Sequence, residues 1–349
     1  MEKIVTMAQG AGGKLMSEFI KEHILSNLTP ANKTGDIDLP LEALDDSAVI
    51  DQIALTTDSY TVSPLFFPGG DIGRLAAAGT INDLAVIGAR PVAMTCSFII
   101  EEGFRMNLFD RICRNLSETA KEVSLPIITG DTKVVERGAI NELMINTTAI
   151  GYRSEMLDRN LSEARRALDK NWLVDSNLES GDQIILSGNL ADHGAALLSK
   201  RYGVQSPIKS DVAPIYGIVQ EALRVGGVVA AKDPTRGGLS NLLNEWSEKS
   251  KIGIFVQEQA IPISEGSRAI CEMLGIDPLT IGNEGKAVLG VVKEKAGDVL
   301  KAIRRHPLGK NASIIGEISG EIKGVVMETS VGTKRIVESP LGDPIPRIC

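Results

Sequence analysis

The sequence predicts an α/β protein of two domains followed by an extended C-terminal arm. At 349 residues, the chain is longer than one ordinary hydrophobic core requires. Strand-like apolar stretches alternate with helix-like stretches through both halves of the chain. The segment 339–349 contains three prolines, which remove backbone donors and exclude a helix or a central strand there.

The first domain is expected to cover residues 1–155. We expect strands over 48–57, 91–100, 125–129 and 142–152, and helices over 71–88, over 107–123, and from the glycine-rich N-terminal segment to Leu28. Asp71 is a typical N-cap residue for the first long helix. Gly88, with Pro91 shortly after it, is typical of the end of that helix.

The second domain is expected to cover residues 156–338, after a boundary in the polar stretch 154–171. Its expected strands are 182–187, 252–256, 287–292 and 313–318, and its expected helices are 192–201, 212–225, 238–249, 264–274 and 297–305. Both halves show a βαβ-like pattern. The remaining residues, 339–349, form the arm that ends at Cys349.

Composition excludes several classes of function. The net charge of −8 and the lack of a basic run argue against nucleic-acid binding. No apolar run is long enough to cross a membrane and no signal peptide is visible, so a cytoplasmic protein is expected. The four cysteines form no CxxC pair and should be free thiols. Three scattered histidines give no zinc-ligand spacing, so any metal should be a hard cation on carboxylates.

A glycine-rich segment near the N-terminus can be read in two ways. Gly10, Gly12 and Gly13 precede Lys14 and a predicted helix. Glycines let backbone N–H groups approach an anion, and a helix N-terminus with a lysine adds positive potential. The pattern is not a Walker A motif, and taken alone it favours a plain glycine-rich turn over a phosphate site.

Acidic residues stand at the ends of several predicted elements. They are Asp46, Asp58, Asp83, Asp131 and Asp233. Carboxylates gathered at strand ends around one cleft suit Mg²⁺, although each alone is more simply a turn or cap residue. Asp83 is harder to explain as a cap, because it lies beside Asn82 in an otherwise apolar helix, where an ionised group needs a partner.

Two further residues are candidates for chemistry. Glu284 lies in a turn between Gly282 and Gly285, which suits either a presented carboxylate or a simple hairpin turn. Cys349 lies at the tip of the proline-stiffened arm, which is typical of a carrier thiol. Arg347 would favour its thiolate, while the terminal carboxylate would oppose it.

These motifs, taken in order, resemble the AIR-synthase-like ATP-binding superfamily over essentially the whole chain. The matching segments are GAGGK at 10–14, DDSAV at 45–49, TTDSY at 56–60, NDLA at 82–85, GDTK at 130–133 and DPTRGG at 233–238. The final PRIC, 346–349, is similar to the C-terminus of the HypE family within that superfamily. A sibling family, selenophosphate synthetase, carries a reactive Cys or selenocysteine in the glycine-rich loop, which is absent here.

The resemblance implies a fold and a set of ligands. It implies an N-terminal domain whose mixed sheet pairs with a second copy in a dimer barrel, so a homodimer, with ATP and Mg²⁺ near that interface. The residues that it implies for nucleotide binding are Gly10, Gly12, Gly13, Lys14, Asp58, Asn82, Asp83, Thr129, Gly130 and Asp131. Those that it implies for the metal are Asp46, Asp83 and Asp233.

The resemblance also implies a reaction. The carbamoyltransferase HypF places a carbamoyl group on Cys349, and ATP drives its dehydration to a thiocyanate. Lys133 and Glu284 are the candidates for orienting the amide and removing its proton. The cyano group then passes to iron on the HypC–HypD scaffold, for [NiFe]-hydrogenase maturation. The arm must therefore alternate between a docked and a free state, and its length of about 36 Å when extended allows this.

Two other functions remain open from the residues alone. A small-molecule kinase or synthase, such as a thiamine-monophosphate kinase, would share the fold but would have no need for a terminal thiol. A non-catalytic carrier would display Cys349 but would have no need for the acidic cluster. His193 and Trp246 are expected to be packing or surface residues.

Overall fold

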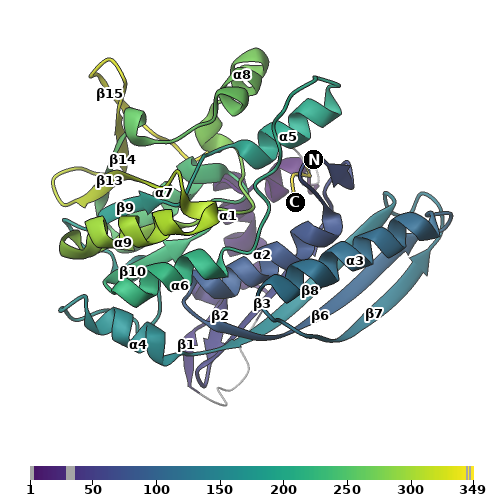
Figure 1. Cartoon of the computed structure of the whole chain (residues 1–349), viewed down its shortest axis with the longest axis horizontal. Coiled ribbons are helices and arrows are strands. Elements are labelled where there is room, and N and C mark those ends of the chain that lie inside the picture. The colour runs from purple at the N-terminus through teal and green to yellow at the C-terminus, as the bar shows by residue number, and fades with distance from the viewer. Residues whose placement is uncertain (1–3, 29–35, 343–344, 346) are drawn as a thin grey trace.

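The computed structural model describes residues 4–28, 36–342, 345 and 347–349. A six-stranded sheet belongs to the first half of the chain and a seven-stranded sheet to the second half (Figure 1). A short two-stranded pair, β4 (Phe66–Phe67) and β5 (Gly70–Asp71), precedes the first long helix. Within these described residues, no helix is both long and apolar enough to cross a membrane.

The first sheet is mixed. Its order is β1 (Ile37–Leu39), β2 (Ala48–Ile50), β3 (Ile53–Tyr60), β8 (Leu143–Tyr152), β6 (Arg90–Glu101) and β7 (Ile127–Val135). Only β6 and β7 are parallel, and α3 (Met106–Glu122) makes the crossover between them. The helices α2 (Ile72–Val86) and α3 cover one face of this sheet, and Figure 1 shows no helix over the other face.

The second sheet is mostly antiparallel. Its order is β10 (Val228–Lys232), β12 (Val288–Val291), β9 (Gln183–Leu186), β13 (Ser313–Ser319), β11 (Gly253–Gln257), β14 (Val325–Glu328) and β15 (Lys334–Ile336). Only β11 and β14 run parallel. The helices of this half are α4 (Glu155–Ser162), α5 (Asp192–Arg201), α6 (Tyr216–Val225), α7 (Gly238–Ser250), α8 (Glu265–Leu274) and α9 (Lys293–Arg305).

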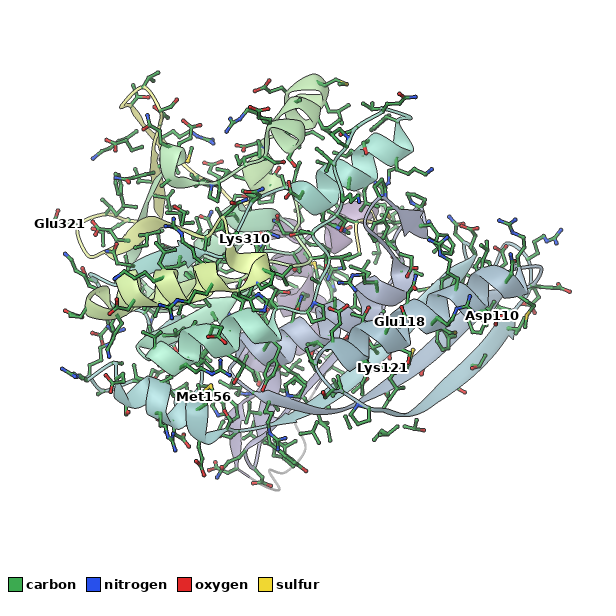
Figure 2. The ribbon with its side chains drawn as sticks, in the orientation of Figure 1. Asp110, Glu118, Lys121, Met156, Lys310 and Glu321 are labelled. Atoms are coloured by element: carbon green, nitrogen blue, oxygen red, sulfur yellow. The ribbon has the colours of Figure 1, made fainter. Side chains whose placement is uncertain are left out.

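The two long N-terminal helices follow from their sequence patterns. Asp71 caps α2 as predicted, because its side chain accepts hydrogen bonds from the backbone of Gly73 and Arg74. Gly88 follows the helix with a φ of 85°, the left-handed conformation typical of a helix stop. The helix α3 is amphipathic: Figure 2 shows Asp110, Glu118 and Lys121 along it, and these residues are exposed while its other face packs inward.

The helix α2 is almost entirely buried because it lies between the two halves of the chain. It packs on β3, β6 and β8 of the first sheet and on α6 and β10 of the second half. One hydrophobic cluster therefore continues from Ile81 and Leu84 of α2 to Ile218 of α6 and Leu289 of β12. The side chains that α2 carries are thus held at the junction of the halves.

Several predictions about the first half need correction. The strand expected over 48–57 is a hairpin of β2 and β3, with Asp51 and Gln52 at positive φ in its two-residue turn. The strand expected over 125–129 extends to Val135. The motif 130–133 therefore lies inside β7 and not after a strand. Asp58 likewise lies inside β3 and not at its end. The N-terminal helix is α1 (Lys14–Phe19) continued by a π-helix over 20–25, and it stops before Leu28.

The second half also differs from its prediction in several elements. The polar stretch 154–171 contains α4, whose N-cap Ser154 accepts a hydrogen bond from Leu157 N–H. The helix α6 begins at Tyr216, later than predicted, and α9 begins at Lys293, earlier than predicted. Strands β10, β14 and β15 were not predicted. The βαβ-like reading is wrong for most of this half, since its strands pair antiparallel.

The C-terminal arm is packed against the body of its own chain. Ile345 and Ile348 are buried in the cluster that includes Ile72 and Leu75 of α2. Cys349 lines one pocket with Met7 and Ala8, so the arm lies beside the N-terminal segment. The described residues of the arm are non-helical, as predicted, and the structure shows them docked on the body of the chain.

Candidate functional site

A small acidic pocket of about 220 Å³ lies at the junction of the two halves. Its lining residues are Asp46, Thr56, Thr57, Asp58, Tyr60, Gly79, Asp83, Asp233, Thr235, Arg236, Glu284 and Cys349. Five of these residues are carboxylic acids, contributed by the loop before β2, by strand β3, by α2, and by the loops that follow β10 and precede β12. The structure thus brings Cys349 into the same pocket as the predicted metal residues.

Asp83 is held by the neighbouring strand. Thr56 Oγ1 donates to Asp83 Oδ2 at 2.7 Å, and Ser47 Oγ donates to the Asp83 backbone carbonyl at 3.1 Å. Burial, with the charges of Asp58, Asp233 and Asp46, raises the pKa of Asp83 well above its usual value. An added cation would relieve this repulsion.

Asp233 and Glu284 are the most deeply buried acids of the pocket, at 5% and 2% exposure. Asp233 Oδ2 and Glu284 Oε1 are buried with no hydrogen-bond partner among the described residues. Burial is the main reason why both pKa values lie well above their usual range. The loop around Glu284 is held by Asp211, which accepts from its backbone N–H and pairs with Lys286 at 3.0 Å. Buried polar atoms without partners are typical of a site that receives a ligand.

Asp46 is tied to a lysine behind the pocket. Lys232 Nζ lies 3.5 Å from Asp46 Oδ1 and 2.9 Å from Glu245 Oε2. Burial raises the pKa of Asp46 to about 6, and the charge of Lys232 opposes that rise. Lys232 therefore keeps Asp46 closer to its ionised form than burial alone would allow.

Arg236 is the one cationic side chain among the residues that line the acidic pocket. Its charge opposes the rise in pKa of both Asp58 and Glu284. The glycine-rich segment packs against it, since a Cβ at Gly12 would lie 2.4 Å from Arg236 Cβ. Arg236 therefore joins the N-terminal segment to the acidic cluster.

Two further pockets adjoin the acidic one. A pocket of about 300 Å³ shares Asp46, Asp233, Thr235 and Arg236 with it and is also lined by Gly12 and Gly13. Another, of about 410 Å³, shares Arg236 and Cys349 with it and is also lined by Gly10. The acidic pocket is thus continuous with spaces beneath the glycine-rich segment.

The arm reaches this place through backbone pairing. Thr61 N–H donates to a terminal carboxylate oxygen of Cys349 at 3.1 Å, and Ser63 N–H donates to the Arg347 carbonyl at 3.2 Å. Arg347 Nε donates to the Thr61 carbonyl at 2.7 Å. These bonds come from the segment that follows β3, so Asp58 and Cys349 are positioned by the same stretch of chain.

Three predicted residues lie on the opposite face of the first sheet. Asp58 pairs with Thr147, a buried residue on the face that α2 covers. Asp131 pairs with Ser97, which pairs in turn with Asn146. Because Asn146 is next to Thr147 in the strand, Asp131 lies on the other face. Thr129 and Lys133 share the face of Asp131, and all three are exposed. Lys133 and Asp131 line a separate hollow. Within a single chain, Lys133 and Glu284 are therefore not brought together.

Asn82 and the glycine-rich segment also differ from their expected positions. The Asn82 side chain is fully buried and hydrogen-bonds to the backbone of Ala213, Ile215 and Glu284, so it links the two halves. Lys14 is exposed and lines none of the three adjoining pockets. Gly13 touches the arm, since a Cβ there would lie 2.0 Å from the Pro340 carbonyl oxygen. Gly130 packs inside the sheet against Cys96.

Across the described part of the chain, no three acidic, histidine or cysteine side chains are close enough to share one metal ion as they stand. Asp46, Asp83 and Asp233 nevertheless line one pocket, and their mutual repulsion suits a divalent cation.

Sequence reasoning missed several residues of the site. Arg236 lay within the motif 233–238 and Lys232 directly before it, but neither was given a role. Thr56 was read only as part of a strand tip. His193 was treated as a packing residue, although its imidazole lies 2.9 Å from the Ile348 carbonyl oxygen. The available signal for Arg236 and Lys232 was their position within and directly before the motif 233–238.

Both halves of the chain match one family of known proteins. Residues 44–152 match the AIR synthase related protein family, N-terminal domain, and residues 179–328 match its C-terminal domain. The chain is 49% identical to a hydrogenase expression/formation protein of Methanocaldococcus jannaschii, over 99% of each chain. It is 41% identical to the carbamoyl dehydratase HypE of Bradyrhizobium diazoefficiens, over 99% of this chain and 96% of that one.

Solved structures of HypE proteins share the fold. A HypE–HypF complex has a chain that is 39% identical and superposes with a TM-score of 0.82, covering 92% of this chain and 99% of that one. A HypE in complex with ATP is 36% identical, with a TM-score of 0.78 over 99% of this chain and all of that one. The chain therefore belongs to the HypE branch of the AIR synthase related family.

Proposed function

We propose that this protein is an ATP-dependent carbamoyl dehydratase that converts a carbamoyl group on Cys349 to a thiocyanate, for the maturation of [NiFe]-hydrogenase. One observation carries the proposal: the terminal thiol lines the same pocket as the acidic residues Asp83, Asp233 and Glu284. The names of the relatives point to the same reaction, and a HypE of the same fold has been solved with ATP.

The donor set of the pocket fits Mg²⁺. The ion prefers oxygen ligands and is usually held by a few carboxylates together with phosphate oxygens. Asp46, Asp83 and Asp233 would hold it, and the unpartnered Asp233 Oδ2 is one free donor. When bound, Mg²⁺ would neutralise charge on the phosphates of ATP.

The chemical problem is the loss of oxygen from S–C(=O)–NH₂. ATP transfers its γ-phosphoryl group to the carbamoyl oxygen, which makes that oxygen a leaving group. Loss of phosphate, together with removal of both N–H protons, leaves S–C≡N, ADP and phosphate. Arg236 is placed to stabilise the negative charge that moves onto the departing phosphate.

Glu284 is the residue that we assign to proton removal. It lines the pocket with Cys349, its Oε1 has no partner among described residues, and its pKa is raised. A carboxylate with a raised pKa is a stronger base once ionised, and the ideal pKa of a general base lies near the working pH. Arg236 acts against the rise and helps to keep part of the population ionised.

We propose that the protein works as a homodimer through the first sheet. The strand β7 is an edge strand whose residues 127–134 are all exposed, and the uncovered face carries exposed apolar side chains such as Leu55 and Ile99. Such an edge is normally covered. In this arrangement Thr129, Asp131 and Lys133 would face a second copy, which is where they could contribute to a nucleotide site.

The proposed reaction requires two transfers between proteins: the carbamoyl group must arrive at Cys349 and the cyano group must leave it. We propose HypF as the donor of the carbamoyl group, since a relative has been solved in complex with HypF. The product thiocyanate would pass its cyano group to the iron held by HypC–HypD. We place this work in the cytoplasm, where the four free thiols would stay reduced.

Intact mass spectrometry of the carbamoylated protein tests the reaction. With MgATP, the adduct should lose about 18 Da, the mass of the water that ATP hydrolysis accounts for. Cys349→Ala should never acquire the adduct, and Glu284→Gln should acquire it without converting it. A stable carbamoyl adduct in the presence of MgATP would favour the carrier function, and turnover with a free small molecule would favour a kinase.

A further inference from the structure

One face of α5 forms a seat for the last residues of the arm. His193 lies at the start of this helix and Arg201 at its end, two turns later on the same face. Arg201 Nη2 donates to the Arg347 carbonyl at 2.8 Å, and His193 Nε2 lies 2.9 Å from the Ile348 carbonyl oxygen. The two side chains therefore bind consecutive carbonyl groups directly before Cys349.

The hydrogen bond to Ile348 fixes a proton on Nε2 of His193. A carbonyl oxygen only accepts, so Nε2 carries the proton and donates it to Ile348. Ser210 Oγ lies 2.7 Å from Nδ1 and also accepts from the Val212 N–H at 3.0 Å. The Ser210 hydroxyl proton is then available to Nδ1, and every polar group of the set is satisfied when the imidazole is neutral.

The seat is shaped for the arm as well as bonded to it. Gly194 leaves room that Ile345 occupies, since a Cβ there would lie 2.7 Å from Ile345 Cδ1. Ile345 and Ile348 are almost fully buried, and Phe67 packs edge-on against the His193 ring at 5.4 Å. His193 itself has no exposed surface while the arm is docked.

We propose that His193 is a positioning residue for the dehydration step, which holds the arm in its seat so that the loaded Cys349 stays beside Asp83 and Glu284. This inference rests on the proposed function. His193 does not line the acidic pocket, so it acts through the Ile348 carbonyl, which is bonded directly to the backbone nitrogen of Cys349. Because the peptide group is planar, a fixed Ile348 carbonyl also fixes the position of the Cys349 backbone nitrogen.

The bond matters mainly to the docked state. If His193 could not donate, the docked arm would bury the Ile348 carbonyl with one bond fewer, whereas the free arm would expose it to water. The ratio of docked to free arm should fall about tenfold, which corresponds to one lost buried hydrogen bond of about 1.4 kcal/mol. A free arm is also what a carbamoyl donor must reach, so loading and dehydration should respond in opposite directions.

Two variants distinguish the effect of the hydrogen-bond donor of His193 from the effect of its ring shape. His193→Phe keeps an aromatic ring and removes both nitrogens, whereas His193→Gln keeps a donor toward Ile348 and an acceptor toward Ser210. Brief trypsin treatment measures docking without any reaction, because cleavage after Arg347 releases Ile348 and Cys349. We expect release about tenfold faster in His193→Phe than in the original protein, and nearly unchanged release in His193→Gln. Equal release rates in the original protein and His193→Phe would overturn the proposal.

Single-turnover conversion of the carbamoylated protein at saturating MgATP measures positioning. His193→Phe should convert more slowly, because the Ile348 carbonyl next to the loaded Cys349 is no longer held, with unchanged affinity for nucleotide. His193→Gln should convert at nearly the original rate. A slowed His193→Gln that equals His193→Phe would show that the ring itself is needed and would overturn the assignment. If the unaltered protein does not convert its adduct, the proposed function fails while the trypsin comparison still decides the docking role.

A measurement on the unaltered side chain covers the case in which His193→Phe does not fold. The chain has three histidines, so imidazole signals in ¹⁵N-correlated NMR spectra can be assigned by single substitutions. We expect a neutral ring with the proton on Nε2 and slow exchange of that proton with solvent. A chain lacking residues 347–349 should lose this protection. Persistence of the protected Nε2 proton without the arm would overturn the proposal.

Discussion

Thr56 Oγ1 donates a hydrogen bond of 2.7 Å to Asp83 Oδ2, and this bond joins β3 to α2 at the floor of the acidic pocket. The bond orients the carboxylate through one of its two oxygens. It also favours the ionised form of Asp83, against the burial and the neighbouring acids that raise its pKa. A strand and a helix are thus used together to hold one charge in place.

The first prediction concerns this carboxylate. Asp83→Asn should acquire the carbamoyl adduct normally, because loading requires only a free arm, but its conversion with MgATP should slow about a hundredfold through loss of charge in the site. Thr56→Val should slow conversion less, since the carboxylate remains. The measurement is intact mass against time. Asp110→Asn, an exposed position on α3, is the matched control and should convert at the original rate. Normal conversion by Asp83→Asn would exclude Asp83 from the site.

The second prediction concerns Lys232, which links Asp46 to Glu245. Lys232→Met leaves two largely buried carboxylates without their cation, so the free energy of unfolding should fall by about 2 kcal/mol. The pKa of Asp46 should rise further, because Lys232 opposes that rise in the original protein. Denaturant unfolding measures the stability change and calorimetric titration measures affinity for Mg²⁺ with nucleotide.

Lys301→Met is the matched control for this substitution. Lys301 pairs with Asp298 at 3.0 Å on the exposed face of α9, where both side chains are mostly in solvent. Its removal should change stability by less than about 0.5 kcal/mol. If both variants lost the same free energy of unfolding, the position of Lys232 beside Asp46 would stabilise the fold no more than an exposed ion pair does.

The acidic cluster was predictable in membership but not in geometry. The sequence motifs singled out Asp46, Asp83 and Asp233. The folded chain brings them into one pocket, because α2, which carries Asp83, is enclosed by both halves. Asp131 and Asp58 lie on opposite faces because of the strand register. A shift of one residue would turn every side chain of a strand to the other face, and the sequence of β7 alone does not define the register. The reach of β7 to Val135 was missed because its glycine and polar residues resemble a loop.

The seat of the arm was harder to predict. Prolines correctly indicated a non-helical segment, but nothing in the local sequence of α5 specifies contacts with residues more than 140 positions away. The partners of His193 and Arg201 are backbone carbonyls, which leave no mark in the sequence of the arm. Gly194 is the closest to a local signal, since it is needed for the close approach of Ile345.

The third prediction concerns pH. The pKa of Asp46 is about 6 in the folded chain and lower in the unfolded chain, so the folded chain holds more protons between about pH 4 and pH 6. The stability of the magnesium-free protein should therefore fall as pH rises through this window. Asp83, Asp233 and Glu284 act in the same direction at higher pH, because their pKa values are also raised.

Thermal unfolding with and without MgCl₂ and ATP measures this dependence. Because the cation binds ionised carboxylates, the stabilisation by MgATP should be larger at pH 8 than at pH 5.5. Asp46→Asn should lose part of the pH dependence of the magnesium-free protein. A stabilisation by MgATP that is equal at both pH values would contradict ligation by these acids.

The last prediction tests the contact between the glycine-rich segment and the arm. A Cβ at Gly13 would lie 2.0 Å from the Pro340 carbonyl oxygen, and the Lys14 N–H donates to the same oxygen at 3.4 Å. Gly13→Ala must therefore displace Pro340 or the segment itself, and both movements loosen the docked arm. Trypsin should release Ile348 and Cys349 faster from this variant in the absence of nucleotide. Gly10→Ala is the matched control, because a Cβ at Gly10 meets nothing within 4 Å and should leave the release rate unchanged. If both substitutions gave the same rate, the segment would not restrain the arm, and docking would depend on α5 and the residues after β3 alone.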